Sequence, residues 1–277
     1  MNTSRAFRYL LLGSAVAVTL AACDRGNKDK QADNAAIVAE VDGPLSYESV
    51  TPYAKVSLTL PEGIRGYPNL YKTLYDSETT ALKEYSEGAQ SDRSEFGSNT
   101  LPPYEKSIIY SEAVETGRLF SMMRTDFDYS GGAHPNTTAT GVLWDRINQK
   151  QLAIGDLFAT DADKAALNRL LCDAVNQAKT GREGAIALSK SDGTWTCPDA
   201  NKVPVVLAAS QTAGKASGLT FLLDPYAVGP YVEGPYYLTI PFTALGNLIR
   251  PDYVGEFGGT GTTGDVTNAV RPDVKPS

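Results

Sequence analysis

The sequence is poor in the side chains that most often carry metal or nucleophilic chemistry. It has one histidine, His134, and three cysteines among 277 residues. Cys172 and Cys197 lie far apart in the sequence and His134 stands elsewhere, so these residues make a poor zinc-ligand set. The chain also lacks an internal repeat, a glycine-rich phosphate loop followed by lysine, and a Gly-x-Ser-x-Gly nucleophile elbow. We therefore expect no metal, no cofactor and no catalytic residues.

The longest apolar run is also short. It covers 10–22, only 13 residues, which is too few to span a bilayer as a helix but suits the apolar region of a signal peptide. Arg5 and Arg8 precede it, and it ends in small residues directly before Cys23. This ending resembles the bacterial lipobox, in which the cysteine receives acyl chains such as palmitate and becomes the new N-terminus. We expect a signal peptide at 1–22 and lipidation of Cys23; plain secretion and an uncleaved anchor are the alternatives.

Acyl chains on Cys23 would hold the protein at the cell envelope, on the periplasmic side of a membrane. Asp24 follows the cysteine, and in enteric bacteria an aspartate there resembles an inner-membrane retention signal. The rule does not hold in all bacteria, so the choice between inner and outer membrane stays open. Residues 23–44 are polar and without periodicity, which predicts a flexible tether between lipid and domain.

Basic residues are outnumbered by acidic ones. Without residues 1–22 the chain keeps 23 lysines and arginines against 32 acids, a net charge of −9. Such a surface repels nucleic acid and favours a cationic partner, although many acidic surfaces serve only solubility.

The compartment outside the cytoplasmic membrane is oxidising, so we expect a disulfide between Cys172 and Cys197. A thiol activated by His134 is the weaker alternative.

Hydrophobic periodicity predicts an α+β fold, with antiparallel β-meander sheets packed by a few helices. Alternation over 53–60 predicts a strand, and helical spacing predicts a helix over 68–87, where Gly88 would end it. Strand-like segments with short turns follow over 108–144 and again near 152–154. Thr160 and Asp163 form a capping box for a second helix with an apolar stripe. Later expected elements are strands at 203–208, 219–223 and 236–240, a short helix over 241–249, and a disordered, glycine-rich tail over 252–277.

The segment from Tyr129 to Pro135 is the most distinctive in the sequence. Gly131 and Gly132 permit positive φ angles, and Pro135 fixes its own φ, so His134 would be presented on a constrained turn. His134 is a candidate ligand contact or general base, although a lone histidine in such a turn more often hydrogen-bonds the turn. A second loop offers tyrosines that suit an interface or a sugar, or that pack on a sheet edge. The ligand-binding candidates are Gly131, Gly132, His134, Tyr226, Tyr231 and Tyr236, with Tyr237 beside them.

Acidic residues on one strand face are a further, weaker candidate. Asp126 and Asp128 have the spacing of a glycosidase pair, and Ser121 or Ser130 with His134 could in principle form a triad. A solvated acidic strand face is the simpler interpretation. A peptidoglycan-directed hydrolase is therefore the less favoured hypothesis.

Three blocks together resemble a known family. They are 129–135 with Trp144-Asp145, then 154–158 before a helix, then 225–242 with its Pro, Gly and Tyr residues. Together they resemble the RsiV-like family of extracytoplasmic domains of unknown function. The family includes the sensing domain of a lysozyme-responsive anti-sigma factor and an accessory region of a peptidoglycan deacetylase. The resemblance implies an envelope-binding domain in two modules, here 45–130 and 131–251.

The implied ligand is lysozyme in one branch of the family, and a peptidoglycan-related ligand is the other possibility. This sequence departs from the signalling branch, because it has an expected lipid anchor in place of a transmembrane helix and no cytoplasmic segment. We therefore expect capture of lysozyme, another cationic envelope protein or peptidoglycan rather than signalling. A structural or assembly lipoprotein is the alternative.

Overall fold

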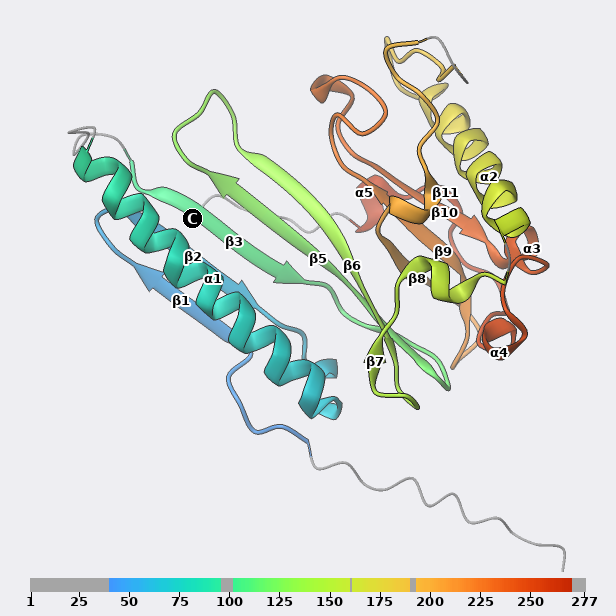
Figure 1. Ribbon diagram of the computed structural model, residues 1–277, viewed down its shortest axis with the longest axis horizontal. Coiled ribbons are helices and arrows are strands. Elements are labelled where there is room, and N and C mark those ends of the chain that lie inside the picture. Colours follow the sequence, from blue (N-terminus) through green and yellow to red (C-terminus); the bar gives the residue numbers. More distant parts are fainter. Residues whose placement is uncertain (1–39, 96–101, 160, 190–192, 271–277) are drawn as a thin grey trace, which may run out of the picture. The chain divides into compact units, whose positions relative to one another are not determined.

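The fold combines two β-sheets with a few helices (Figure 1). It is seen in a computed structural model, which describes residues 40–95, 102–159, 161–189 and 193–270. The first sheet has seven strands in the order β1-β2-β3-β5-β6-β7, with β4 paired to β5, and the second has the order β11-β10-β9-β8. The predicted α+β class with mainly antiparallel sheets is confirmed. No helix of the described ranges is both long and apolar enough to span a bilayer.

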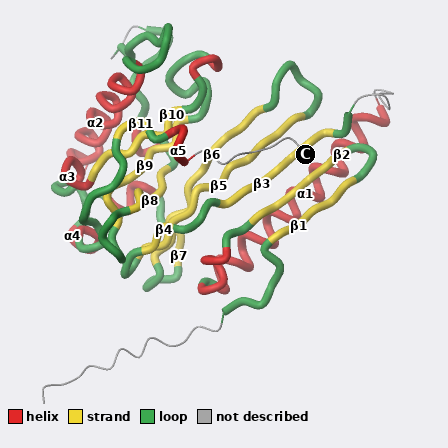
Figure 2. Tube along the Cα trace, turned by 180° about the vertical axis from the view of Figure 1, so that it is seen from behind, coloured by secondary structure: helices red, strands yellow, loops and turns green. Residues whose placement is uncertain are grey.

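The first sheet carries helix α1 on one face, as both views show (Figures 1 and 2). The predicted alternation is confirmed in β2, where Ala54, Val56 and Leu58 are buried against α1. Sequence analysis did not predict that β2 and β3 are parallel, with α1 as the crossover between them. The bounds are β1 Ser46–Val50, β2 Ala54–Thr59, β3 Tyr104–Tyr110, β4 Val114–Glu115, β5 Leu119–Tyr129, β6 Asn136–Asp145 and β7 Lys150–Gln151.

Helix α1 spans Pro68–Glu95 and so continues past Gly88, where it was predicted to end. Packing beyond the glycine explains the difference, because Ala89 and Arg93 are both buried. Arg93 also donates from Nη1 to the carbonyl oxygen of Pro102 at 2.5 Å. Tertiary packing thus extends the helix through a residue of low helix propensity.

The second sheet packs helix α2, Asp161–Lys179, on one face. The predicted stripe is confirmed, since Leu167, Leu171 and Val175 are fully buried. The predicted disulfide is also confirmed: Cys172 on α2 is bonded to Cys197, with their Cα atoms 5.1 Å apart. Thr160 and the side chain of Asp163, the predicted capping box, lie outside the described residues. The strands are β8 Val205–Ala209, β9 Ala216–Leu223, β10 Tyr236–Pro241 and β11 Gly264–Asp265.

The proposed module boundary at residue 130 falls in a β-hairpin. β5 and β6 pair antiparallel on either side of it, so one sheet runs through the boundary. Alternate residues of the two strands enter different cores. Phe120 and Trp144 face the core under α1, whereas Leu119 and Leu143 face the core under α2. The β5–β6 hairpin is therefore common to both cores.

The segment after residue 251 is ordered as far as 270, so the prediction of a disordered tail from 252 is wrong there. Tyr253 is buried and donates its hydroxyl to Asp145 Oδ2 at 3.1 Å. Val266 is buried beside β10 and donates its amide to the Tyr237 carbonyl at 2.8 Å. Residues 271–277 lie outside the described part.

The short elements are η1 Glu62–Gly66, η2 Ile154–Leu157, η3 Ala200–Lys202, η4 Tyr231–Glu233, α3 Phe242–Leu245, α4 Pro251–Val254 and α5 Thr267–Val270.

Smaller differences have local causes. The strand predicted near 152–154 is displaced: pairing with β6 involves 150–151, and 154 begins η2. The helix predicted over 241–249 is limited to α3. The end of the predicted tether, 40–44, is held to the domain because Arg65 Nη1 donates to the carbonyl oxygens of Val41 at 2.7 Å and Gly43 at 2.9 Å.

Candidate functional site

The β5–β6 loop presents His134. Gly131 has φ +84°, a left-handed conformation that favours glycine, and lets the chain turn directly after β5. The imidazole Nδ1 lies 3.0 Å from the Pro135 carbonyl oxygen. Because a carbonyl only accepts, Nδ1 is the donor in this contact. The residue as a whole is exposed.

The loop that joins β9 to β10 presents the tyrosines. It opens at Asp224, whose Oδ1 accepts from the Ala139 amide of β6 at 2.8 Å, so the loop start is fixed to the first sheet. Tyr226 follows with φ +70°, an uncommon conformation for a non-glycine residue. Burial raises the pKa of Asp224 to about 6, and the Ala139 amide only partly offsets that rise.

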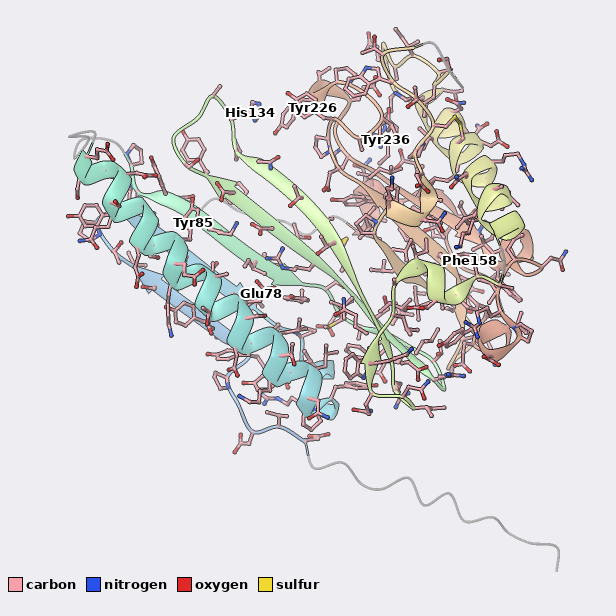
Figure 3. The ribbon with its side chains drawn as sticks, viewed as in Figure 1. Glu78, Tyr85, His134, Phe158, Tyr226 and Tyr236 are labelled. Atoms are coloured by element: carbon pink, nitrogen blue, oxygen red, sulfur yellow. A yellow bond between two sulfur atoms is a disulfide. The ribbon has the colours of Figure 1, made fainter. Side chains whose placement is uncertain are left out.

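The two loops meet through their aromatic rings. The imidazole of His134 stacks on Tyr231, with centroids 4.1 Å apart and ring planes at 24°. Tyr226 lies against the same tyrosine at 5.6 Å. The Tyr231 hydroxyl donates to the Pro135 carbonyl at 3.0 Å and so ties one loop to the other. We call His134, Tyr226, Tyr231 and Val232 together the aromatic patch, in which Tyr231 is half-buried and the other three residues are exposed. Figure 3 shows His134 and Tyr226 at the same end of the domain.

The patch is apolar and accessible. Val232 is 89% exposed and Tyr226 is 57% exposed. A hollow of about 230 Å³ adjoins Tyr231, lined also by Thr137, Pro225, Gly234, Pro235 and Tyr237. Such a hollow beside exposed rings can accept one small side chain or one sugar substituent.

A buried ion pair holds the loop that carries Tyr231 and Val232. Lys179 Nζ, at the end of α2, lies 2.6 Å from Glu233 Oε2, and their side chains are 2% and 6% exposed. Burial opposes ionisation of Glu233, but hydrogen bonds from Lys179 and Tyr236 outweigh it and hold the pKa of that carboxyl below its ordinary value. A Cβ on Gly229 would overlap the Glu233 carboxylate, which explains a glycine at this position.

Arg182 provides a second support. Its Nη1 donates to the carbonyl oxygens of Glu233 at 2.6 Å and Pro235 at 2.7 Å. Its guanidinium lies 3.5 Å from the ring centroid of Tyr236, a cation–π contact. The backbone around η4 is therefore held by Arg182, in the turn after α2, and the Glu233 carboxylate is held by Lys179 at the end of α2.

The structure brings most of the predicted ligand-binding candidates together and separates one. Gly131, Gly132, His134, Tyr226 and Tyr231 lie in the two loops that meet. Tyr236 is only 1% exposed, and its hydroxyl donates to Glu233, so its role is to position the loop. Tyr237 is also buried, although it borders the hollow. Cys23 lies outside the described residues. Sequence reasoning missed Val232, because a single valine in a loop gives no signal of exposure.

The weaker catalytic candidates have other partners. Lys106 Nζ lies 2.6 Å from Asp126 and 3.3 Å from Asp128, and Arg124 lies 3.1 Å from Asp126. The expected solvated acidic face is therefore a partly buried ion-pair network. Ser121 is buried, and its hydroxyl accepts from the Leu207 amide at 3.1 Å. In the described ranges no group of three or more His, Cys, Asp or Glu could hold a metal ion.

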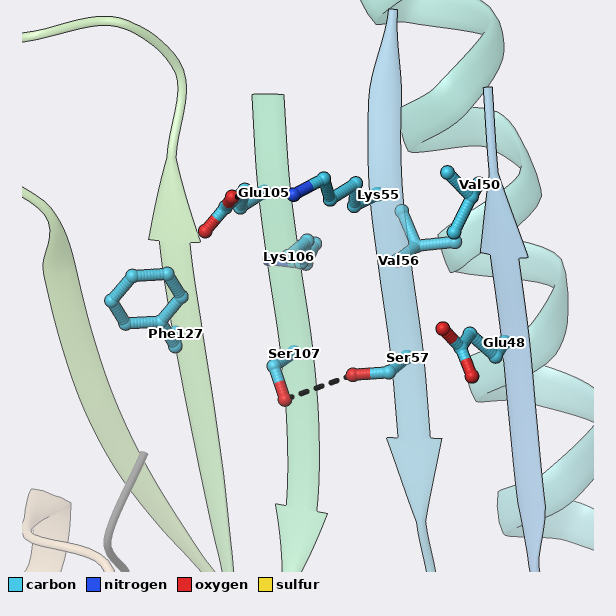
Figure 4. A pocket seen from close by; sticks show the side chains of 9 residues that line it. All are labelled: Glu48, Val50, Lys55, Val56, Ser57, Glu105, Lys106, Ser107 and Phe127. Carbon is cyan, nitrogen blue, oxygen red and sulfur yellow. Dashed lines mark hydrogen bonds and ion pairs between the residues drawn. The ribbon is translucent and has the colours of Figure 1, made fainter. Parts of the chain in front are cut away.

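A second hollow lies on the first sheet and was not predicted (Figure 4). It has about 430 Å³, and four of its polar residues form two pairs. Ser57 donates to Ser107 across β2 and β3 at 3.0 Å, and Lys55 lies 3.5 Å from Glu105. These internal pairs favour a structural role for the hollow.

The fold and the patch define a mixed α+β domain with an exposed site formed by two loops. A family model described as "Protein of unknown function (DUF3298)" matches residues 155–243. The matched range includes α2, β8 to β10 and the tyrosines of the patch, but not His134. No curated protein matches the chain.

Solved structures of two DUF3298 family proteins are similar to this chain. One, from Pseudomonas aeruginosa PAO1, is 17% identical with a TM-score of 0.52, and the match covers 79% of this chain and 99% of that one. The other, from Bacteroides fragilis NCTC 9343, is 19% identical with a TM-score of 0.47, covering 73% of this chain and 86% of that one. The first similarity shows a shared fold.

Proposed function

We propose that the protein is a lipid-anchored cell-envelope binding protein of the RsiV-like type, which captures its partner through the aromatic patch and has no catalytic activity of its own. The observation that carries the proposal is the patch itself. Tyr226 and Val232 present exposed apolar surface, with the half-buried Tyr231, beside His134 on two loops that are tied together. The other large apolar residues that are exposed in the described part lie on separate elements; they are Val50, Ile147, Ile186, Val254 and Val270.

The construction of the patch suits binding. Tyrosine side chains supply rigid area and a hydroxyl, and they are enriched among residues that dominate interface energies. The buried Lys179–Glu233 pair fixes the loop before any partner arrives. Less conformational entropy is then lost on association, which strengthens binding.

Two partner classes fit the proposal. Lysozyme or another cationic envelope protein would be attracted by the net charge of −9 that remains after signal cleavage. A peptidoglycan-related ligand would use the tyrosine faces and the adjoining hollow. His134 hydrogen-bonds a carbonyl and stacks on a tyrosine, and neither contact pairs it with a nucleophile.

The test is calorimetric titration of the mature chain, residues 23–277 with Cys23→Ser, against lysozymes of several classes at two salt concentrations. Binding of peptidoglycan is measured in parallel by co-sedimentation with purified sacculi. One-to-one lysozyme binding that persists at moderate salt supports capture through a specific interface. Binding that disappears with salt reflects opposite net charges alone, because surface attraction is screened.

The absence of binding in both assays would contradict the proposed partner classes. Release of soluble fragments from the sacculi would contradict the non-catalytic part of the proposal. The anchor has its own test: metabolic labelling with a palmitate analogue is expected to mark the wild-type protein and not Cys23→Ser.

A further inference from the structure

We propose that the protein has a second ligand site, a cavity between its two sheets that takes a small neutral molecule with an apolar body and one hydrogen-bond-accepting oxygen. The cavity has about 360 Å³ and lies on the opposite face of the second sheet from α2. That volume falls in the range of small-molecule sites. Its lining residues are Ser111, Glu112, Val114, Met123, Val206–Ala209, Thr220, Thr239, Thr262, Val266, Ala269 and Val270.

The floor of the cavity follows from strand register. Val206 of β8 is aligned with Thr220 of β9, which is aligned with Thr239 of β10, so the three side chains form one row on one face. The neighbouring row contains Leu222 and Tyr237, which fill the space between the sheets. The row of smaller residues leaves that space open.

The walls come from outside the second sheet. Met123 of β5 lies opposite the floor and contacts the core cluster that contains Val266. Val270, at the end of α5, is 38% exposed and lines the opening. The apolar part of the lining is thus supplied by both sheets and by the C-terminal helix, and it favours an apolar ligand.

The floor also offers one hydrogen-bond donor. The hydroxyls of Thr220 and Thr239 are 2.8 Å apart, and each residue is only 4% exposed. Their mutual bond uses one of their two hydrogens, and neither hydroxyl makes another hydrogen bond within the described ranges. A buried donor without an acceptor is unfavourable, so a ligand oxygen at this point would be stabilising.

The charge of the lining argues for a neutral ligand. Among the lining residues that the structure describes, which end at Val270, Glu112 is the only ionisable side chain, and it is exposed. It would repel a carboxylate or a phosphate, and the described lining supplies no cation to hold one. An alcohol, ester or amide oxygen accepts from the threonine pair without a net charge.

Benzyl alcohol and toluene are the probes, because they differ in the oxygen and share the ring. Each is titrated into the mature chain, residues 23–277 with Cys23→Ser, labelled with ¹³C at the methionine methyl groups. Met122 and Met123 are adjacent in β5 but face different cores, so Met122 is an internal control. We expect benzyl alcohol to shift the Met123 resonance saturably and to leave Met122 unchanged. Toluene should bind about tenfold more weakly, since it leaves the donor unpaired.

Two variants test the geometry. Thr220→Val combined with Thr239→Val removes both hydroxyls while keeping their shape, so the fold is retained and the preference for the alcohol is lost. Val270→Asp places a charge at the opening and should weaken both probes, whereas Val50→Asp, at a residue that does not line the cavity, should not. Circular dichroism confirms folding of each variant.

Several results would overturn the proposal. One is a Met123 resonance that does not move, or that moves together with Met122. Another is an unchanged preference for the alcohol in the double-valine variant, and a third is unchanged binding in Val270→Asp. A Met123 shift that depends on protein concentration without a probe would instead make the cavity a contact between two copies of the chain.

Discussion

Lys179 and Glu233, separated by 54 residues in the sequence, form an ion pair of 2.6 Å in the interior of the domain. Lys179 ends α2, and Glu233 belongs to η4 directly after Tyr231 and Val232. The same carboxylate accepts from the Tyr236 hydroxyl. The pair thus connects the helix of the second sheet to the loop that presents the aromatic patch.

Breaking this pair is expected to destabilise the domain and loosen the patch. Lys179→Met leaves the Glu233 carboxylate buried without its cation, which costs about 3–5 kcal/mol. The free energy of unfolding, measured by urea denaturation monitored by fluorescence, should fall by that amount. Partner affinity should fall as well, because the loop loses its support.

An exposed ion pair is the matched control. Lys72 and Asp76 lie 2.5 Å apart on the surface of α1, with side chains 78% and 59% exposed. Lys72→Met should change the unfolding free energy far less than Lys179→Met, because solvent screens an exposed pair. Lys179→Met combined with Glu233→Gln should recover part of the lost unfolding free energy, since neither residue of the pair then carries a charge. Equal changes in unfolding free energy for Lys179→Met and Lys72→Met would show that burial does not make the Lys179–Glu233 pair more important for stability than an exposed pair.

The aromatic patch is expected to supply most of the binding energy. Tyr231→Ala removes the ring on which His134 and Tyr226 pack, and should weaken partner binding at least tenfold. The measurement is calorimetric titration with the lysozyme or sacculus fraction that binds the wild-type chain.

Two exposed valines form the matched comparison for the patch. Val232→Ala should weaken binding about fivefold, whereas Val50→Ala should leave it unchanged. Val232 is 89% exposed and Val50 is 64% exposed, so neither substitution disturbs a core. Equal affinities of the two valine variants would contradict the assignment of the site.

Local patterns in the sequence predicted several parts of this structure. Alternation predicted β2, the 3.6-residue stripe predicted α2, and the cysteine content, with the expectation of an oxidising compartment, predicted the disulfide. Each depends on neighbouring residues or on composition. The two loops of the patch were also predicted, because glycine and proline mark turns.

The features that sequence analysis missed depend on residues far apart in the chain. The ordered tail requires Tyr253 to reach Asp145, 108 residues earlier. The joining of the two sheets requires a glycine at 141, where a Cβ would overlap the Val205 backbone. Tyr236 was grouped with the exposed tyrosines because only the register of β10 shows that it faces the core.

The disulfide should contribute a measurable part of the stability. Cys172 and Cys197 close a loop of 25 residues, and the chain-entropy model gives about 3 kcal/mol for that length. Replacing both cysteines by serine should lower the unfolding free energy by this order. Reduction of the wild-type protein should have the same effect, whereas the reductant should not change the serine variant. A loss under about 1 kcal/mol would mean that α2 and its contacts already order this loop.

Asp224 should give the domain a distinctive response to pH. Burial raises the pKa of Asp224 to about 6 in the folded protein, against an ordinary value of 3.8. A raised pKa means that the folded state binds the proton more tightly than the unfolded state. The contribution is therefore fully present below about pH 4, and it is lost as the pH rises to about 6.

The pH dependence caused by Asp224 must be separated from that of carboxyl groups whose pKa is lowered on folding. Asp145, whose pKa is lowered to about 2, stabilises the fold above its ordinary pKa and loses that contribution as the pH falls. Asp224→Asn keeps an oxygen that can accept from the Ala139 amide and removes only the titration. We expect the melting temperature of the wild type, relative to this variant, to decrease between pH 4 and pH 6 and then to level off. A difference that stays constant over that interval would show that Asp224 titrates alike in both states, and that its fixing of the loop start does not depend on protonation.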